Sequence, residues 1–270
     1  MRIFKRFGLA ASYVTSIPFT ALDPAQVAPE GESTSSMDLL HGLSKYLPVV
    51  GAMVGAMLCA LTLLLLHFGI GNLLVALIVT IAWLFVTGGL HMDGLMDTTD
   101  GIASHRSRDR MLEIMTDPRV GNFGSLSGTC ALLTKFASIA SMPLNPVSTI
   151  LVILFLAPAW ARWCEAFAIG AFEYAKPDGK GKIWHETTKF PQDVVRAIAV
   201  PLFLTCIFCY FGYWVALLCA GCSMLSGLSA AIWLNKKLGG QTGDTYGAVV
   251  EIAEAGSLLG CALILQSGIL

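Results

Sequence analysis

The sequence NLLVALIVTIAWLFVTGGL (residues 72–90) is followed directly by HMDGLMDTTDG (residues 91–101). The first part is almost entirely apolar and long enough to cross a membrane, because roughly 20 apolar residues of helix span a bilayer. The second part carries Asp93, Asp97 and Asp100, spaced i, i+4 and i+7, which places the three carboxylates on one face of a helix. The sequence therefore predicts an acidic helix at a membrane boundary.

The composition of the whole chain is typical of a membrane protein. Of 270 residues, 55% are apolar and only 13% are charged, whereas charged residues make up about 25% of a soluble domain. We expect one all-α, polytopic helical bundle over residues 1–270, embedded in the lipid bilayer, with about seven spans. The predicted spans cover residues 48–67, 72–90, 125–142, 147–170, 194–211, 213–234 and 252–269. The net charge of −1 gives no reason to expect a nucleic-acid partner.

The charged residues predict the orientation of the chain. The connections at 67–72, 142–147 and 211–214 contain no Lys, Arg, Asp or Glu. Positive residues collect in cytoplasmic loops, so we expect the other loops and the N-terminus in the cytoplasm, and the C-terminus outside. Residues 1–22 predict an amphipathic segment at the membrane surface, and residues 23–45 a polar loop. The eight cysteines indicate no disulfide framework.

A second acidic segment follows the first. Asp109, Glu113 and Asp117 repeat at i+4, and a turn near His105 would bring their face against Asp93, Asp97 and Asp100. Closely spaced carboxylates repel one another unless a cation binds, and oxygen ligands without cysteine favour Mg²⁺. The alternative is a solvated charged helix with pairs such as Arg110–Glu113. The predicted metal ligands are Asp93, Asp97, Asp100, Glu113 and Asp117.

Ionisable residues also lie inside the predicted spans. Lys135 falls deep in the span 125–142, where a lysine is costly unless it pairs with an anion or faces a cavity. Arg162 and Glu165, spaced i,i+3, either pair with each other or have a function. Glu251 and Glu254 are expected near the start of the last helix, where negative charge is favourable. The preceding glycines would permit close backbone approach, and Asp244 would add a ligand or bind a ribose or an amide.

Three segments resemble the cobalamin synthases, which are adenosylcobinamide-GDP ribazoletransferases. They are Gly88–Gly101, Arg106–Asp117 together with Arg119, and Gly239–Glu251. Met96, Thr116, Pro118 and Asn122 depart from the family's usual pattern, but none of these changes removes a carboxylate. The start of the motif, Asp97-x-x-Asp100-Gly101, is also similar to that of the CDP-alcohol phosphotransferases.

The resemblance implies a magnesium-dependent transferase of the bacterial cytoplasmic (inner) membrane, with its active site facing the cytoplasm. A hydroxyl of α-ribazole, or of α-ribazole 5′-phosphate, would attack the pyrophosphate of adenosylcobinamide-GDP. The products would be adenosylcobalamin, or its 5′-phosphate, and GMP. A homo-oligomer or an association with other cobalamin-assembly enzymes is a further expectation. The expected catalytic residues are Asp93, Asp97, Asp100 and Asp117. The expected substrate-binding residues are His91, Arg106, Arg119, Lys135, Thr242, Asp244 and Glu251.

The competing interpretation is a cation- or proton-coupled transporter that uses the same acidic cluster. The charges inside the predicted spans favour it. The position of the strongest acidic cluster outside the spans, and the absence of an evident internal repeat, favour an enzyme.

Overall fold

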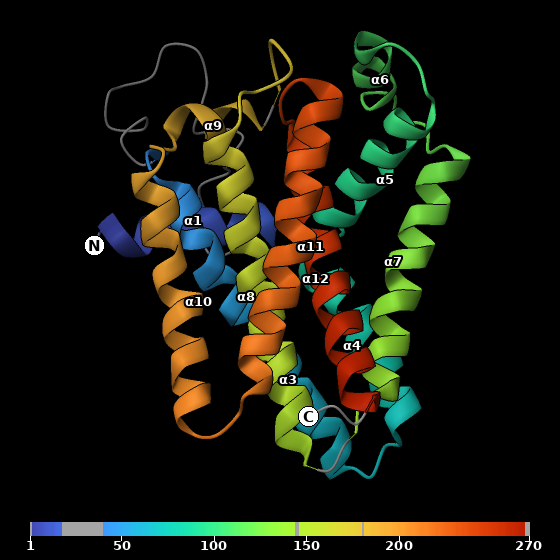
Figure 1. Cartoon of the computed structure of the whole chain (residues 1–270), viewed down its shortest axis with the longest axis vertical. Coiled ribbons are helices and arrows are strands. Elements are labelled where there is room, and N and C mark those ends of the chain that lie inside the picture. The colour runs from blue at the N-terminus through green and yellow to red at the C-terminus, as the bar shows by residue number, and fades with distance from the viewer. Residues whose placement is uncertain (1, 18–39, 144–145, 180, 268–270) are drawn as a thin grey trace.

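The computed structural model describes residues 2–17, 40–143, 146–179 and 181–267, and these residues form a helical bundle without strands (Figure 1). Residues 23–39 of the predicted polar loop lie outside the described residues. The all-α class is confirmed. The elements are α1 (Arg2–Val14), η1 (Leu43–Tyr46), α3 (Leu47–His67), α4 (Asn72–Val86), α5 (Leu90–Ala103), α6 (Arg108–Ile114), α7 (Asn122–Ser141), α8 (Val147–Ala171), α9 (Lys182–Thr187), α10 (Gln192–Tyr210), α11 (Val215–Leu238) and α12 (Gly243–Gln266).

The long apolar helices make the chain a multi-pass membrane protein. In the described part of the chain, 5 helices are long and apolar enough to cross a bilayer, namely α3, α8, α10, α11 and α12. The bent pair α4 and α5 would raise the count to 6. Helix α7 forms at the predicted span 125–142, but its serines, threonines and Lys135 make it more polar than the five long apolar helices. The number seven is therefore not confirmed.

Helix α8 lies at the centre of the bundle and packs against α3, α10, α11 and α12. Gly51 and Gly55 of α3 lie directly on the α8 backbone at Pro158 and Phe155, where a β-carbon would collide. This close approach of small residues is the expected way for helices to associate in lipid. Large apolar side chains cover the outer faces, such as Leu74 on α4 and Phe203 on α10, and they suit contact with lipid.

The first motif does not continue the apolar helix that precedes it. Helix α4 ends at Val86, and the axes of α4 and α5 meet at 86°. Gly88 and Gly89 have φ values of 62° and 71°, a left-handed conformation that glycine adopts without steric cost. The sequence predicts that residues 72–90 lead straight into the acidic stretch. The two glycines instead turn the acidic helix away from the apolar one.

The connections sort to two ends of the bundle (Figure 1). The helix ends that flank the uncharged α3–α4, α7–α8 and α10–α11 connections lie at one end, and α6, α9 and the α11–α12 loop lie at the other. The separation of charged from uncharged loops is thus confirmed, whereas the cytoplasmic location of the charged end stays a prediction. Helix α1 is amphipathic as expected, because Leu9 and Val14 are buried whereas Lys5 is exposed. Its contact with a membrane surface also stays a prediction.

Candidate active site

A cavity of about 250 Å³ lies between α1, α5, α8, α9 and α12. Polar groups from different helices meet in it. Its lining includes His91, Asp93, Glu165, Trp184, Asp244 and Gly247. His91 and Glu165 are buried, whereas Asp93 is exposed and Asp244 is half-buried. The cavity therefore runs from an acidic, accessible part to a polar, buried floor.

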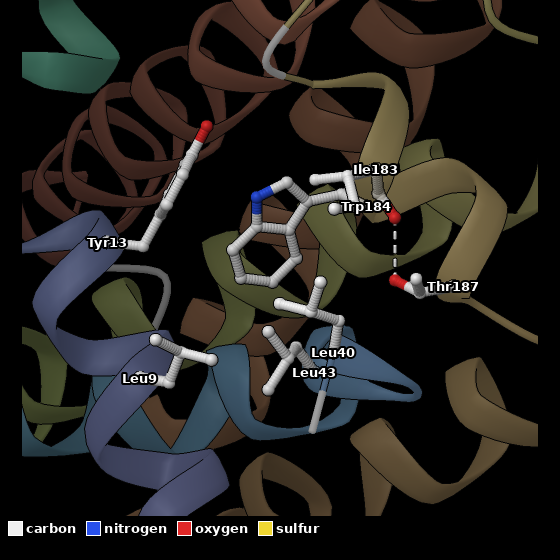
Figure 2. A pocket seen from close by; sticks show the side chains of 7 residues that line it. All are labelled: Leu9, Tyr13, Leu40, Leu43, Ile183, Trp184 and Thr187. Carbon is white, nitrogen blue, oxygen red and sulfur yellow. Dashed lines mark hydrogen bonds between the residues drawn. The ribbon is translucent and has the colours of Figure 1, made fainter. Parts of the chain in front are cut away.

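Two aromatic residues, Tyr13 and Trp184, form a wall between this cavity and a smaller one of about 20 Å³, which is shown in Figure 2. Tyr13 and Trp184 line both cavities, with ring centroids 5.1 Å apart and ring planes at 65°. Leu9, Leu40 and Leu43 fill the other side of the small cavity. Because the small cavity is almost entirely apolar and very tight, it serves to pack α1 and α9 against each other. The wall thereby fixes one side of the larger cavity.

Glycines bring the acidic helix α5 against the start of α12. A β-carbon on Gly94 would lie 2.6 Å from the Asp244 carbonyl oxygen, and one on Gly247 would lie 3.0 Å from the His91 Cα. The two backbones can approach this closely only because neither glycine has a side chain. The prediction that glycines of this loop permit close backbone approach is confirmed at Gly247. As a result, Asp244 stands beside Asp93 and Asp97.

The acids at the α5–α12 crossing form the acidic cluster, which we define as Asp93, Asp97 and Asp244. Asp97 is half-buried, and the charges of Asp93, Asp244 and Asp100 act on it. The Lys176 Nζ lies 3.1 Å from Asp244 Oδ2. One ammonium facing several carboxylates leaves an excess of negative charge, and such an arrangement favours a bound cation.

The loop before α12 is tied down by backbone and capping contacts. The Gln241 N–H donates to the Glu173 carbonyl at 2.8 Å, and the Ala175 N–H donates to the Gln241 carbonyl at 2.7 Å. Thr242 is the N-cap of α12 and forms a reciprocal capping box with Thr245. Thr242 is fully buried, so in this structure it caps the helix that presents Asp244. Its expected contact with substrate stays a prediction.

Asp100 has a different role from its neighbours on α5. Its two carboxylate oxygens accept hydrogen bonds from the N–H groups of Gly121 and Gly124, both at 2.7 Å. These N–H groups belong to the first turn of α7, which lacks hydrogen-bond partners within its own helix. Asp100 thus anchors the start of α7 rather than facing the cavity. A β-carbon at either glycine would collide with this carboxylate.

A buried ionic network lies beneath the cavity floor. Lys135 Nζ is 2.8 Å from Glu251 Oε2 and 2.5 Å from Glu254 Oε2, and it stands 4.6 Å from the centre of the Trp83 ring. Arg162 donates to Glu254 Oε1 at 2.5 Å. The predicted pairing of Lys135 with an anion is confirmed. The network links α4, α7, α8 and α12, and it fixes the helices that carry the cavity.

Comparison with known proteins places these features in a family. A family model described as cobalamin-5-phosphate synthase matches residues 6–262. The chain belongs to the cobalamin-5-phosphate synthase family. It is 38% identical over 272 residues to an adenosylcobinamide-GDP ribazoletransferase of Desulfitobacterium hafniense, covering 96% of this chain and 97% of that protein. A protein of the same name from Synechococcus sp. is 37% identical over 215 residues, covering 79% and 84% of the two chains. No solved structure matches the chain.

Membership in the cobalamin-5-phosphate synthase family does not bring all the expected ligands together. Among the described residues, no group of three or more His, Cys, Asp or Glu side chains stands close enough to hold a metal ion without rearrangement. The expected packing of Asp109, Glu113 and Asp117 against α5 is wrong. Helix α6 instead turns Leu112 and the adjoining Met115 inward, because burying apolar side chains is favourable, whereas moving solvated carboxylates next to other carboxylates costs repulsion.

The charged side chains of α6 and the following loop pair with one another. Arg110 lies 2.5 Å from Glu113, as the alternative of a solvated charged helix predicted. Arg119 donates to both oxygens of Asp117, at 2.9 and 2.6 Å, and lowers the pKa of Asp117 to about 2. Arg106 is exposed and is not part of the cavity lining. Substrate binding by Arg106 and Arg119 stays a prediction.

Of the expectations about the buried charges, one of the two alternatives for Arg162 and Glu165 is excluded, and the position of Glu251 and Glu254 is wrong. Arg162 does not pair with Glu165 but with Glu254, which belongs to another helix. Helix α12 begins at Gly243, so Glu251 and Glu254 lie in its interior and are buried, rather than at the start of a helix. The helix begins early because Thr242 and Thr245 provide a capping box, a signal that the sequence contains.

Sequence reasoning missed several residues that shape the site. Tyr13 and Trp184 form the aromatic wall, and Gly181 lies against Gly243 beside the cavity. Arg108 joins the end of α11 to the segment after α8, because it donates hydrogen bonds to the carbonyls of Leu238 at 2.6 Å and Ala175 at 2.9 Å. No local pattern marks these residues, because each acts on a segment distant in sequence.

Proposed function

We propose that the chain is an adenosylcobinamide-GDP ribazoletransferase. It joins adenosylcobinamide-GDP to α-ribazole, or to α-ribazole 5′-phosphate, and gives adenosylcobalamin, or its 5′-phosphate, and GMP. The observation that carries this proposal is the acidic cluster at the cavity, in a chain that belongs to the cobalamin-5-phosphate synthase family. A pyrophosphate needs charge neutralisation when one of its bonds breaks, and carboxylates with a divalent ion provide it.

Mg²⁺ fits the acidic cluster by donor chemistry. Asp93, Asp97 and Asp244 offer only oxygen ligands. The negative charges of the other acids act on Asp97, so a divalent cation would relieve the repulsion between these carboxylates. The expected ligand set is thereby revised. Asp100 is engaged by two N–H groups, whereas Glu113 and Asp117 pair with arginines. When bound, the ion would supply charge stabilisation to the pyrophosphate.

The proposed transfer is a displacement at phosphorus, in which one oxygen–phosphorus bond forms and another breaks. An oxygen–phosphorus bond forms between the ribazole hydroxyl and the cobinamide-side phosphorus. The bond from that phosphorus to the bridging oxygen breaks, and GMP leaves with the electron pair. A carboxylate of the acidic cluster accepts the hydroxyl proton. Lys176, held beside Asp244, is placed to neutralise charge on the phosphates.

The proposal is tested by measuring GMP release from adenosylcobinamide-GDP and α-ribazole with purified protein in detergent. We expect release with Mg²⁺, loss with EDTA and recovery when Mg²⁺ is added back. Asp97→Asn should lower the rate at least about 100-fold, because it removes charge from the reacting centre. Asp109→Asn is the matched control, since the Asp109 side chain is 90% exposed and pairs only with its neighbour Arg108 among the described residues.

The same assay separates the enzyme from a transporter. A transporter has no reason to produce GMP in micelles, which have no second compartment. Absence of GMP with both substrates and Mg²⁺ present would therefore refute the proposed activity. In the cell, we propose that the charged end of the bundle, with the cavity, faces the cytoplasm of a bacterial inner membrane. Labelling of an engineered cysteine at exposed Glu186 on α9 from the cytoplasmic side only would support this orientation.

A further inference from the structure

The cavity floor carries polar atoms that the described protein leaves unsatisfied. Glu165 is 5% exposed, and its Oε2 has no hydrogen-bond partner among the described residues. Its Oε1 lies 3.8 Å from His91 Nε2, beyond hydrogen-bond distance, and both ring nitrogens of His91 lack such partners as well. Most buried polar atoms have a partner. His91 and Glu165 are both lining residues of the cavity, so the unpartnered polar atoms lie at its floor and point to this cavity as a place where a ligand binds.

Among the described residues, the ion pairs beneath the floor do not include Glu165, although the nearby charge of Arg162 acts on it. Lys135 pairs with Glu251 and Glu254, and Arg162 also pairs with Glu254. Two cations and two carboxylates are thus matched with one another. Glu165 remains outside this set, although removing a carboxylate from water is costly unless other groups hydrogen-bond to it. A ligand with hydrogen-bond donors in the cavity would supply the partners that Glu165 lacks.

On the basis of the proposed function, we propose that Glu165 binds the guanine base of the nucleotide substrate. Guanine presents two neighbouring donors, N1–H and the N2 amine, which match the two oxygens of a carboxylate. Adenine has an acceptor at N1 in their place. The benzimidazole base of α-ribazole has no N–H donor, and a corrinoid is far too large for a cavity of about 250 Å³.

The rest of the cavity suits a nucleotide whose guanine base lies at Glu165. Tyr13 and Trp184 offer aromatic surfaces on which a base can stack, a contact that every nucleobase can make. Gly247 lets α12 pack directly against the backbone of His91, which holds His91 at the cavity. Asp93 and Asp244 line the same cavity as Glu165. A base at the floor would therefore extend its phosphates toward the acidic cluster, where the reacting pyrophosphate is proposed to lie.

The inference is tested by nucleotide binding to the purified full-length protein in detergent with Mg²⁺. The probes are GDP, IDP, which lacks the N2 amine, and ADP, which also lacks N1–H. We expect GDP to bind more tightly than IDP, and IDP more tightly than ADP. Glu165→Gln should weaken GDP binding by about 10- to 100-fold, because hydrogen bonds to a charged group are lost, and should remove the preference for GDP over ADP.

The matched control is Glu173→Gln, because the Glu173 side chain is 92% exposed. This variant should keep both the affinity and the preference. The order of the three nucleotides in the unaltered protein tests the inference even if Glu165→Gln does not fold, and equal affinities for GDP and ADP would overturn it. An unchanged preference in a folded Glu165→Gln variant would also overturn it.

A third result assigns the cavity differently. If Glu165→Gln weakens binding of α-ribazole but not of GDP, the floor belongs to the acceptor substrate and the guanine assignment is wrong. The proposed function is judged separately, by GMP release from the unaltered protein. An active enzyme whose nucleotide preference does not depend on Glu165 refutes only the inference, whereas an enzyme that releases no GMP refutes the function.

Discussion

Lys135 Nζ lies 2.5 Å from Glu254 Oε2, although the two residues are 119 positions apart in the sequence. Their side chains are 3% and 1% exposed, respectively. The contact joins α7 to α12 and continues through Glu254 to Arg162 of α8. It shows that the ionisable residues of the spanning helices stabilise one another and hold the helices on which the cavity is built.

This pairing predicts that Lys135→Met mainly lowers stability. The substitution leaves Glu251 and Glu254 with Arg162 as the remaining cation of the network, and a buried carboxylate that loses its partner costs about 3–5 kcal/mol. Lys135→Met/Glu251→Gln removes one charge of each sign and should recover most of the loss. Thermal unfolding in detergent measures both variants. Equal destabilisation of the single and double variants would contradict this account.

Asp93 and Asp100 should respond differently to the same substitution. Asp93→Asn is expected to lower GMP release strongly with little change in unfolding, because Asp93 is exposed at the cavity. Asp100→Asn has one acceptor oxygen for two N–H groups, so we expect a loss of about 1–2 kcal/mol in stability. Unfolding and activity are measured on both. The distinction fails if the two variants behave alike in both measurements.

The close contact of α5 and α12 predicts a strong effect of Gly94→Ala. The added β-carbon would lie 2.6 Å from the Asp244 carbonyl oxygen, so the helices must separate and the acidic cluster must open. We expect turnover to fall by roughly tenfold or more, since small displacements of reacting groups are costly. Gly221→Ala on α11 is the control, because nothing lies within 4 Å of its added β-carbon. Unchanged turnover in Gly94→Ala would show that the crossing does not position the site.

The Asp117–Arg119 pair predicts a defined pH dependence. Arg119 lowers the pKa of Asp117 from 3.8 to about 2, so the pair stabilises the fold fully above pH 3.8 and this contribution is lost as pH falls toward 2. Any difference in unfolding temperature between the unaltered protein and Arg119→Gln should therefore stay constant from pH 8 to pH 5. The difference should be small, because both residues are largely solvated. A difference that grows or shrinks across this range would indicate another titrating partner.

Much of the fold could be predicted because it depends on local properties. The apolar runs at residues 72–90 and 147–170 predicted the helices that form at Asn72–Val86 and Val147–Ala171, since backbone groups in lipid must form their hydrogen bonds within a helix. The ends of the helices were harder to predict. Gly88 and Gly89 turn the chain by 86°, yet a pair of glycines in an apolar run does not by itself reveal a sharp bend. Helix α12 began nine residues before the predicted start at residue 252, because a capping box, not hydropathy, sets its boundary.

The sequence by itself determined that this chain is a helical membrane protein and that Asp93, Asp97 and Asp100 share one helix, because hydropathy and helical spacing are properties of neighbouring residues. The tertiary structure alone decided which distant acids meet. It placed Asp244 beside Asp97, turned Asp100 to the start of α7 and left Asp117 with Arg119. The physical reason is that spacing within a helix fixes a face, whereas the partner of that face depends on where glycines and buried apolar side chains allow another helix to pack.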